Sequence, residues 1–240
     1  MWEELTKEFT KTFIRENRWK VFLQGFENTL VITFFAVIIG IIIGCVISAV
    51  HSLAGGERQK KRKSLMGWIL IGLDKVCAFA VAVLRGTPLA IQLTITAFII
   101  MAGFPNKIVV CCVAFGLNSG AYVSEVIRGG IEAVDIGQTE AGRSLGLTAF
   151  ATLWKIVLPQ AIKGILPALC NEGIAVLKET AIVGLISVVD LTRASDLVRS
   201  RTMSPYFPLI SVAVVYFILV AGLSGLVSRL ERRLKASDRN

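Results

Sequence analysis

Two carboxylates occur inside an otherwise apolar stretch, residues 164–188. Glu172 and Glu179 are seven residues apart, which in an α-helix returns both to within about 20° of one face, roughly 10.5 Å apart along the axis. A charge inside a membrane-spanning helix is costly, so such residues are functional candidates by default. The pair predicts an acidic site for a cationic or amino-bearing solute. The structural alternative is ion pairing with a basic residue such as Lys178, Arg85 or Arg128.

Asn118 and Glu125 repeat the same seven-residue spacing in a second apolar stretch. Ser119 and Tyr122 lie between them, so one helix would carry a polar stripe. Such a stripe is suited to lining a water-filled pathway. The alternative is that Glu125 simply pairs with Arg128, one helical turn further on.

The segment Arg85-Gly86-Thr87-Pro88 interrupts a third apolar stretch. A break of this kind frees backbone groups at membrane depth, and it is tolerated where those groups line a cavity or are buried in protein. Arg85 could attract a substrate carboxylate there, or it could be an interfacial anchor. The sequence supports the two interpretations equally.

Residue patterns for catalysis or metal binding are missing from the sequence. It contains no HExxH, no Ser–His arrangement and no Gly-Lys dipeptide, so it cannot supply a P-loop. The five cysteines lie in or beside apolar segments without zinc spacing, and the lone His51 suits interfacial anchoring. We therefore expect no metal, no cofactor and no enzyme activity in this chain, and we disfavour an intramembrane enzyme.

The composition describes a membrane protein. Of the 240 residues, 54% are apolar and 18% are charged, with the charges clumped between long apolar runs. The mean hydropathy of +0.69 excludes a disordered chain and disfavours an ordinary soluble domain. The net charge of +9 does not indicate nucleic-acid binding, because the basic residues flank the apolar runs as cytoplasmic loops do.

The chain divides into an amphipathic segment (residues 1–27), a membrane domain (28–233) and a basic tail (234–240). Aromatic and aliphatic residues in the first segment predict a helix lying on the membrane surface. A dense basic run, Arg58–Lys63, follows the first span. The apolar runs are residues 29–50, 67–103, 107–127, 164–188 and 205–228, of which 67–103 is interrupted at Asp74-Lys75 and at Arg85–Pro88.

Five or six spans fit these runs, and both place residues 128–163 and the tail in the cytoplasm. Six spans would put Asp74 and Lys75 in the middle of a short helix, at about 2.5–3.5 kcal/mol for each charge. Five spans let residues 63–76 be a cytoplasmic or interfacial extension, with the second span starting near Cys77. We therefore favour five spans with the N-terminus outside, and six remain the alternative.

Residues 128–163 form a polar stretch that predicts two short helices with a turn near Gly146-Leu147. Gly146 would relieve the steric penalty of a left-handed turn. Thr148 would cap the second helix, and Pro159 would bend or end it before the next span. The first helix is a candidate docking site for a partner protein.

The same stretch resembles the EAA loop of permease subunits of ABC importers. That pattern is E-A-A-x-x-x-G, nine residues, then I-x-L-P. The chain has Glu140-Ala141-Gly142, then Gly146, then Ile156-Val157-Leu158-Pro159. The spacing is kept, and Gly142 replaces the second Ala.

Further matches resemble the polar amino acid branch, the histidine, glutamine and arginine permease-like proteins. The resemblance extends over about residues 25–233. The matching segments are Arg85–Leu89 with Gln92, Leu117–Tyr122, Glu125, Asn171-Glu172 and Leu191–Ala194.

The resemblance implies an all-α integral membrane fold with the five-helix core of a type I ABC importer permease. It implies a bacterial cytoplasmic membrane protein that carries a polar amino acid and works beside a second permease copy or paralogue. A dimer of P-loop ATPase subunits, which holds ATP and Mg, and an extracytoplasmic substrate-binding protein would be its other partners.

The resemblance also suggests roles for individual residues. The coupling residues toward the ATPase would be Glu140, Ala141, Gly142, Gly146 and Leu147. The substrate pathway would use Glu172 and Glu179 near the midplane, with Asn118, Glu125 and Arg85 as weaker candidates. The alternative class is a self-contained channel or secondary transporter for small polar solutes, which an internal repeat would favour; we find none.

Overall fold

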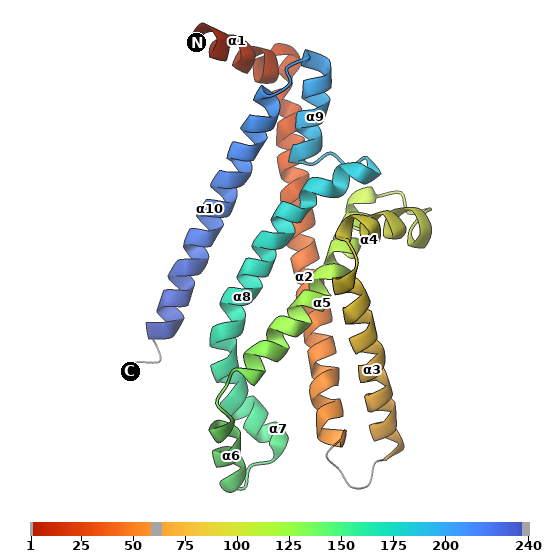
Figure 1. Ribbon diagram of the computed structural model, residues 1–240, viewed down its shortest axis with the longest axis vertical. Coiled ribbons are helices and arrows are strands. Elements are labelled where there is room, and N and C mark those ends of the chain that lie inside the picture. The colour runs from red at the N-terminus through yellow and green to blue at the C-terminus, as the bar shows by residue number, and fades with distance from the viewer. Residues whose placement is uncertain (1, 59–63, 237–240) are drawn as a thin grey trace. The chain divides into compact units, whose positions relative to one another are not determined.

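The computed structural model describes residues 2–58 and 64–236, and within them every regular element is a helix (Figure 1). The basic run predicted at Arg58–Lys63 therefore lies outside the described residues, apart from Arg58. The α-helices are α1 (Trp2–Phe9), α2 (Trp19–Arg58), α3 (Leu65–Gly86), α4 (Leu89–Ile95), α5 (Lys107–Glu132), α6 (Ile136–Ser144), α7 (Ala149–Thr152), α8 (Leu158–Glu179), α9 (Leu191–Thr202) and α10 (Phe207–Ala236).

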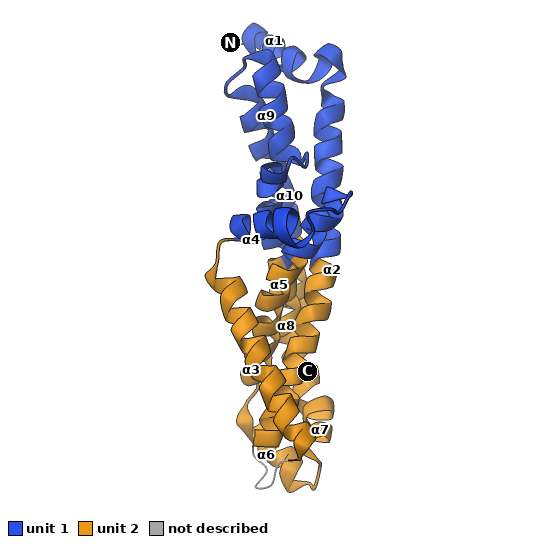
Figure 2. Cartoon of the chain, turned by 90° about the vertical axis from the view of Figure 1, so that its right-hand side faces the viewer, with its two compact units in different colours: residues 1–36, 89–115, 173–225 blue, residues 37–88, 116–172, 226–240 orange. Residues whose placement is uncertain are grey.

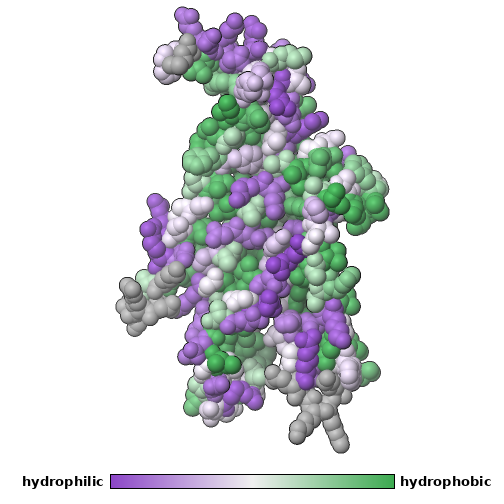
Figure 3. Space-filling view, in the orientation of Figure 1, coloured by the Kyte–Doolittle hydropathy of each residue, from purple (hydrophilic) through white to green (hydrophobic). Residues whose placement is uncertain are grey.

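Four of the described helices are long and apolar enough to cross a membrane: α2, α3, α5 and α10. With 22 residues, α8 equals α3 in length, but it contains Pro167 and several charged residues. Large apolar side chains such as Phe34, Phe79 and Phe217 are exposed, and apolar residues cover much of the surface in Figure 3. A surface of this kind is suited to contact with lipid rather than water.

The chain divides into two compact units, drawn in separate colours in Figure 2. Unit 1 contains residues 1–36, 89–115 and 173–225, and unit 2 contains residues 37–88, 116–172 and 226–240. The helices α2, α5, α8 and α10 each contribute residues to both units.

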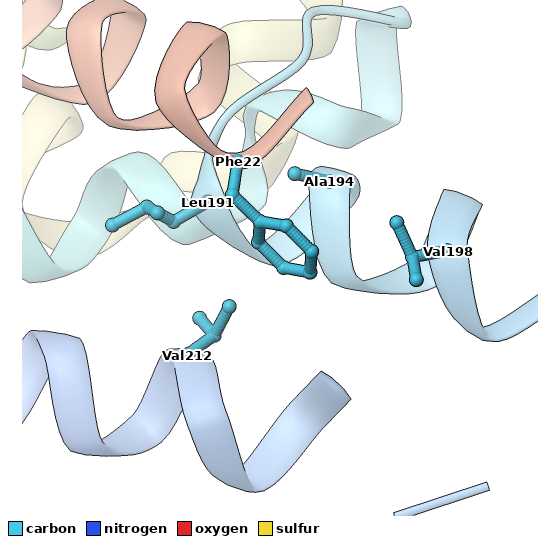
Figure 4. Close-up of a cluster of buried hydrophobic side chains, with 5 residues drawn as sticks. All are labelled: Phe22, Leu191, Ala194, Val198 and Val212. Carbon is cyan, nitrogen blue, oxygen red and sulfur yellow. The ribbon is translucent and has the colours of Figure 1, made fainter. Parts of the chain in front are cut away.

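Unit 1 has an apolar core where the start of α2 meets α9 and α10. Figure 4 shows the buried side chains of this core: Phe22, Leu191, Ala194, Val198 and Val212. Asp190 caps α9, because its carboxylate accepts from the backbone N–H groups of Thr192 and Arg193 at 2.8 and 2.9 Å. Gly25 lies directly against the backbone of Asp190, where a Cβ would come within 2.5 Å of the carbonyl oxygen.

Unit 2 has its own apolar cluster between α5 and α8, made by Val123, Ile127, Ala161 and Ile165. Gly130 belongs to the same contact, since a Cβ there would lie 2.2 Å from a side-chain carbon of Ile165. Close packing of the Ile165 side chain against Gly130 therefore fixes α5 against α8 before any polar contact is considered.

The Asp74-Lys75 pair interrupts the apolar run of the sequence, but it does not interrupt the helix. α3 is a continuous helix from Leu65 to Gly86, and Asp74 is only 4% exposed. His51 contacts its Oδ1 at 2.9 Å, and Arg58 donates to its Oδ2. A buried carboxylate with two hydrogen-bond partners does not need to leave the helix.

The second predicted interruption is present, because α3 ends at Gly86 and α4 begins at Leu89. Pro88 has no N–H to donate, and it disfavours helical geometry in the residue before it. The run 67–103 therefore forms α3, α4 and a π-helical turn over Thr96–Ile100 rather than one span from Cys77.

The amphipathic helix predicted in residues 1–27 is shorter than that segment. α1 ends at Phe9, a π turn follows over Thr10–Ile14, and α2 already begins at Trp19. Glu16 and Asn17 both have a φ of 53°, a left-handed conformation that stops a right-handed helix. α2 therefore starts ten residues before the predicted first span and ends eight residues after it.

Candidate functional site

Glu172 lies on α8 and is half-buried in unit 2. Ser119 of α5 donates a hydrogen bond from its hydroxyl to Oε1 of Glu172, at 3.1 Å. Arg85 and Arg128, two of the ion-pair partners considered for Glu172 from the sequence, both contact Glu125 instead. Glu172 is thus a carboxylate held by a neutral donor rather than neutralised by a cation.

Asn118 and Glu125, predicted as one stripe, meet Arg85, predicted from another segment, where α3 ends against α5. Nη1 of Arg85 lies 3.1 Å from Oε2 of Glu125, and its guanidinium lies over the ring of Tyr122, 5.4 Å from the centroid. Asn118 donates to the carbonyl oxygen of Leu84 at 3.2 Å. That carbonyl belongs to the last turn of α3, where no intrahelical donor is available. The stripe on α5 therefore binds the broken end of α3.

The ion pairs continue along α5 beyond Glu125. Arg128 lies 2.7 Å from Glu125 and 3.0 Å from Glu132, so four charges alternate from the end of α3 to the end of α5. These residues line a cavity of about 360 Å³ between α2, α3 and α5, which also includes His51 and Asp74. Every carboxylate in its wall has a basic partner.

Glu179 is the last residue of α8 and belongs to unit 1. The uninterrupted helix from Leu158 to Glu179 contains both predicted carboxylates, as the seven-residue spacing requires. The structure describes Glu172 with the α5 stripe in unit 2, and it does not bring Glu179 into that cluster.

The loop after α5 forms two helices with a turn at Gly146, as predicted. Asp135 caps α6 by accepting from the N–H of Gly137 at 2.6 Å, and Thr148 caps α7 by accepting from the N–H of Ala151 at 3.2 Å. Gly146 has a φ of +81°, which is the left-handed conformation expected of it.

Pro159 does not end the following helix. The chain stays helical from Ala149 to Glu179, with a π turn over Leu153–Val157 directly before Pro159. A proline cannot donate to the carbonyl four residues earlier, so the wider π turn takes up the disruption.

The outer surface of this loop combines exposed acidic and apolar groups. Glu140 and Ala141 are exposed, and Leu145 is 82% exposed beside them in the sequence. Phe150 and Trp154 are also exposed, and their rings stack in parallel with centroids 6.2 Å apart. Sequence analysis missed these last three residues, although large apolar groups in a polar loop are a usable signal.

Gly142 is buried although its neighbours are exposed. A Cβ at this position would lie 2.8 Å from Cγ2 of Thr152 and 2.9 Å from Cδ1 of Ile156. The replacement of Ala by Gly in the E-A-A pattern therefore permits close contact between α6 and the helical segment from Thr152 to Ile156. Leu147, whose N–H donates to the carbonyl oxygen of Gly142 at 3.2 Å, closes the same turn.

A metal centre is not indicated within residues 2–58 and 64–236. No group of three or more His, Cys, Asp or Glu side chains comes close enough there to hold an ion.

Comparison with known proteins identifies the class. Residues 65–236 match the family described as "Binding-protein-dependent transport system inner membrane component". The matched range extends from the start of α3 to the end of α10, so it includes the stripe on α5, Glu172 and the α6–α7 loop. This chain belongs to that family, and its all-helical fold is that of a type I ABC importer permease.

Individual relatives are similar over nearly their whole length. The chain is 36% identical to the provisionally named glutamine transport system permease protein GlnP of Rickettsia conorii, covering 98% of this chain and 99% of that protein. It is 37% identical to the arginine transport system permease protein ArtQ of Bacillus subtilis, covering 90% and 93%. A solved amino acid ABC transporter with histidines is 38% identical, with a TM-score of 0.78 over 89% of this chain and 94% of that one.

Proposed function

We propose that this chain is the permease subunit of an ATP-driven importer of polar amino acids. Its family supports a role in transport, and the names of its relatives support the solute class. The translocation pathway would form between this chain and a second copy or a paralogue. An extracytoplasmic binding protein would deliver the amino acid.

The proposal of ATPase coupling rests on the exposed surface of α6. The side chain of Glu140 has no hydrogen bond or ion pair with any residue the structure describes. Exposed apolar residues lie on both sides of it in the sequence. The loop behind it is held by two caps and a glycine turn. A surface that is fixed in shape but unpartnered is suited to binding another subunit.

The ATPase would be a separate P-loop protein that holds ATP and Mg. Glu140, Ala141 and Leu147 would contact it or shape the contact, while Gly142 and Gly146 would keep the loop compact. With five spans, this docking would put the α6–α7 loop and the C-terminus in the cytoplasm and the N-terminus outside.

Within the pathway, we assign the solute-facing role to Glu172 and, on the other unit, Glu179. Glu172 has no cationic partner among the described residues, so its carboxylate can accept a hydrogen bond from the ammonium group of an amino acid. Glu179 is assigned to the pathway by the family resemblance alone. Asn118, Glu125 and Arg85 would instead hold the end of α3 against α5, because their polar groups already bind each other or the backbone.

Purification in mild detergent from the native membrane, followed by mass spectrometry, tests the partner assignment. We expect a P-loop ATPase in an equal amount, with or without a second permease. The preparation should take up radiolabelled glutamine, arginine or histidine when reconstituted with its binding protein and ATP. A chain that elutes alone as a stable oligomer would instead favour the channel or secondary transporter.

The orientation has its own test. A cysteine replacing the exposed Leu145, in a variant lacking the native cysteines, should react with a membrane-impermeant reagent only after the cells are opened. Labelling in intact cells would contradict the proposed placement of the loop.

A further inference from the structure

Ser119 stands at the point where three helices of unit 2 meet. It lies on α5, is 1% exposed, and donates its hydroxyl to Glu172 on α8. On its other side is Gly40 of α2, where a Cβ would lie 2.8 Å from Oγ and 2.9 Å from Cβ of Ser119. Only glycine leaves room for the serine in this position, because both of those atoms would have to move for any larger residue.

The contact between α2 and α5 extends over several turns. A Cβ on Gly44 would lie 2.3 Å from Cγ1 of Val123, and Ser48 donates to the carbonyl oxygen of Ser124 at 3.2 Å. Gly40, Gly44 and Ser48 recur every four residues, so one face of α2 is small enough for the backbones to approach closely. Interlocked packing of this density fixes both the rotation and the height of α5.

A fixed α5 gives the Ser119 hydroxyl a fixed direction. The hydroxyl is the one side-chain donor to Glu172 in the described part of the chain. A glutamate side chain has three rotatable bonds, and ordering it costs conformational entropy when a ligand binds. A donor that holds Oε1 in advance removes part of that cost and leaves the carboxylate group pre-oriented.

We propose that Ser119 is a positioning residue for Glu172, and that Gly40 makes the space in which it acts. The inference rests on the proposed function, because it requires Glu172 to accept a hydrogen bond from the transported amino acid. Ser119 itself would not touch the solute.

A double-mutant cycle tests this relation. The variants Ser119→Ala, Glu172→Gln and the double variant are compared in the complete importer, with its ATPase and binding protein. The readout is the initial uptake rate of radiolabelled arginine, glutamine or histidine, whichever the unmodified importer carries fastest. Co-purification of the ATPase is measured in parallel as a check on assembly.

We expect Ser119→Ala to lower the uptake rate about tenfold, the order of effect for a hydrogen bond to a charged group. It should add nothing to the loss caused by Glu172→Gln, because the serine acts through that carboxylate. A purely structural serine would lower uptake by the same factor whichever residue occupies position 172.

Two outcomes overturn the inference in distinguishable ways. If Glu172→Gln is impaired while Ser119→Ala is normal, or if the two losses multiply, the positioning role is wrong and the pathway role of Glu172 stands. If Glu172→Gln transports normally, the pathway role of Glu172 fails and the positioning role fails with it.

The glycine provides an independent test with matched controls. Gly40→Ala should lower uptake as Ser119→Ala does, since the added methyl group displaces Ser119. Gly72→Ala on α3, where a Cβ meets nothing within 4 Å, should leave uptake unchanged. Ser195→Ala controls for removal of a buried hydroxyl, because Ser195 is fully buried and its hydroxyl has no hydrogen-bond partner in the described chain. Normal uptake by Gly40→Ala would contradict the requirement for space at that position.

Discussion

The stripe on α5 and the loop that follows it are adjacent in sequence, but their charges differ in pairing. The charges along α5 form ion pairs, whereas the acidic residue on α6 has no ion-pair partner among the described residues. Along α5, Glu125 is bound by two arginines, and Arg128 is bound by two glutamates. On α6, Glu140 is exposed and has no partner among the described residues. Both regions belong to unit 2, so the difference lies in their surroundings.

The difference follows from the cost of an unpaired charge. Inside a membrane-spanning helix an isolated charge costs about 2.5–3.5 kcal/mol, so pairing with an opposite charge on the same chain is favoured there. In a polar loop, water solvates the same group without such a cost, and the group stays available to another subunit. Paired charges along α5 are thus part of the fold, whereas the charge of Glu140 on α6 is available to the proposed ATPase interface.

Reversing the loop charge is expected to have the largest effect on transport. Glu140→Arg should lower uptake roughly a hundredfold, because it places a buried cation in the proposed ATPase contact. The melting temperature of the purified permease should not change, since the side chain contacts nothing that holds the fold together. Uptake and melting are measured on the same preparation.

The matched control for this variant is Glu3→Arg on α1, which also reverses an exposed acidic residue. It should leave uptake unchanged. Equal losses for both variants would show that net charge, rather than the α6 surface, matters.

Removing Glu125, the carboxylate that both Arg85 and Arg128 contact, should have the largest effect on stability. Glu125→Ala leaves Arg85 and Arg128 without their shared partner, which we expect to cost about 2–3 kcal/mol. Glu132→Ala is the control, because Glu132 is exposed and pairs with Arg128 alone, as surface pairs do. Denaturation of the detergent-purified chain measures both, and equal losses would show that the stripe does not depend on burial.

Local features of the fold, such as turns and helix caps, could be predicted from the sequence because local backbone geometry determines them. Gly146 and Thr148 were predicted as a left-handed turn and a cap, and both are confirmed at those residues. A positive φ favours glycine, and an N-cap favours a short hydroxyl side chain, whatever the rest of the chain does. The break at Pro88 was predicted for the same kind of reason.

Features that depend on distant partners were not predicted. Asp74 was placed outside the second span because an unpaired charge would be costly there, and its partners, His51 and Arg58, lie 23 and 16 residues away. Arg85 and Glu125 were each singled out, but their ion pair connects two helices and has no periodic signal within either one. The pair of Glu125 with Arg128, one turn apart on α5, was considered from the sequence and is present, whereas the contacts between helices could not be predicted.

Replacing Gly146 tests whether the turn between α6 and α7 requires a left-handed backbone conformation. Gly146→Ala should destabilise the chain by about 1–2 kcal/mol, because alanine at a φ of +81° is strained. Gly129→Ala on α5 is the control: a Cβ there meets nothing within 4 Å, and alanine is the better helix former by about 1 kcal/mol. The two variants should therefore shift the denaturation midpoint in opposite directions. A stabilising Gly146→Ala would contradict the turn seen in the structure.

The smallest effect is expected where the chain departs from the E-A-A pattern. Gly142→Ala restores the pattern and gains about 1 kcal/mol of helix propensity, but its Cβ enters space held by Thr152 and Ile156. Overpacking typically costs about 1–3 kcal/mol, so we expect a net loss of about 1 kcal/mol in the free energy of unfolding.

The companion change Ile156→Val removes Cδ1, the atom that would lie 2.9 Å from the new methyl group. By itself it should cost about 1 kcal/mol, as a lost methyl group in a packed contact does. Combined with Gly142→Ala, it should cost less than the sum of the two single changes, because the second change makes room for the first. Additive losses would show that α6 is not packed against this segment, and the surface around Glu140 would then lack the rigid support on which its docking role depends.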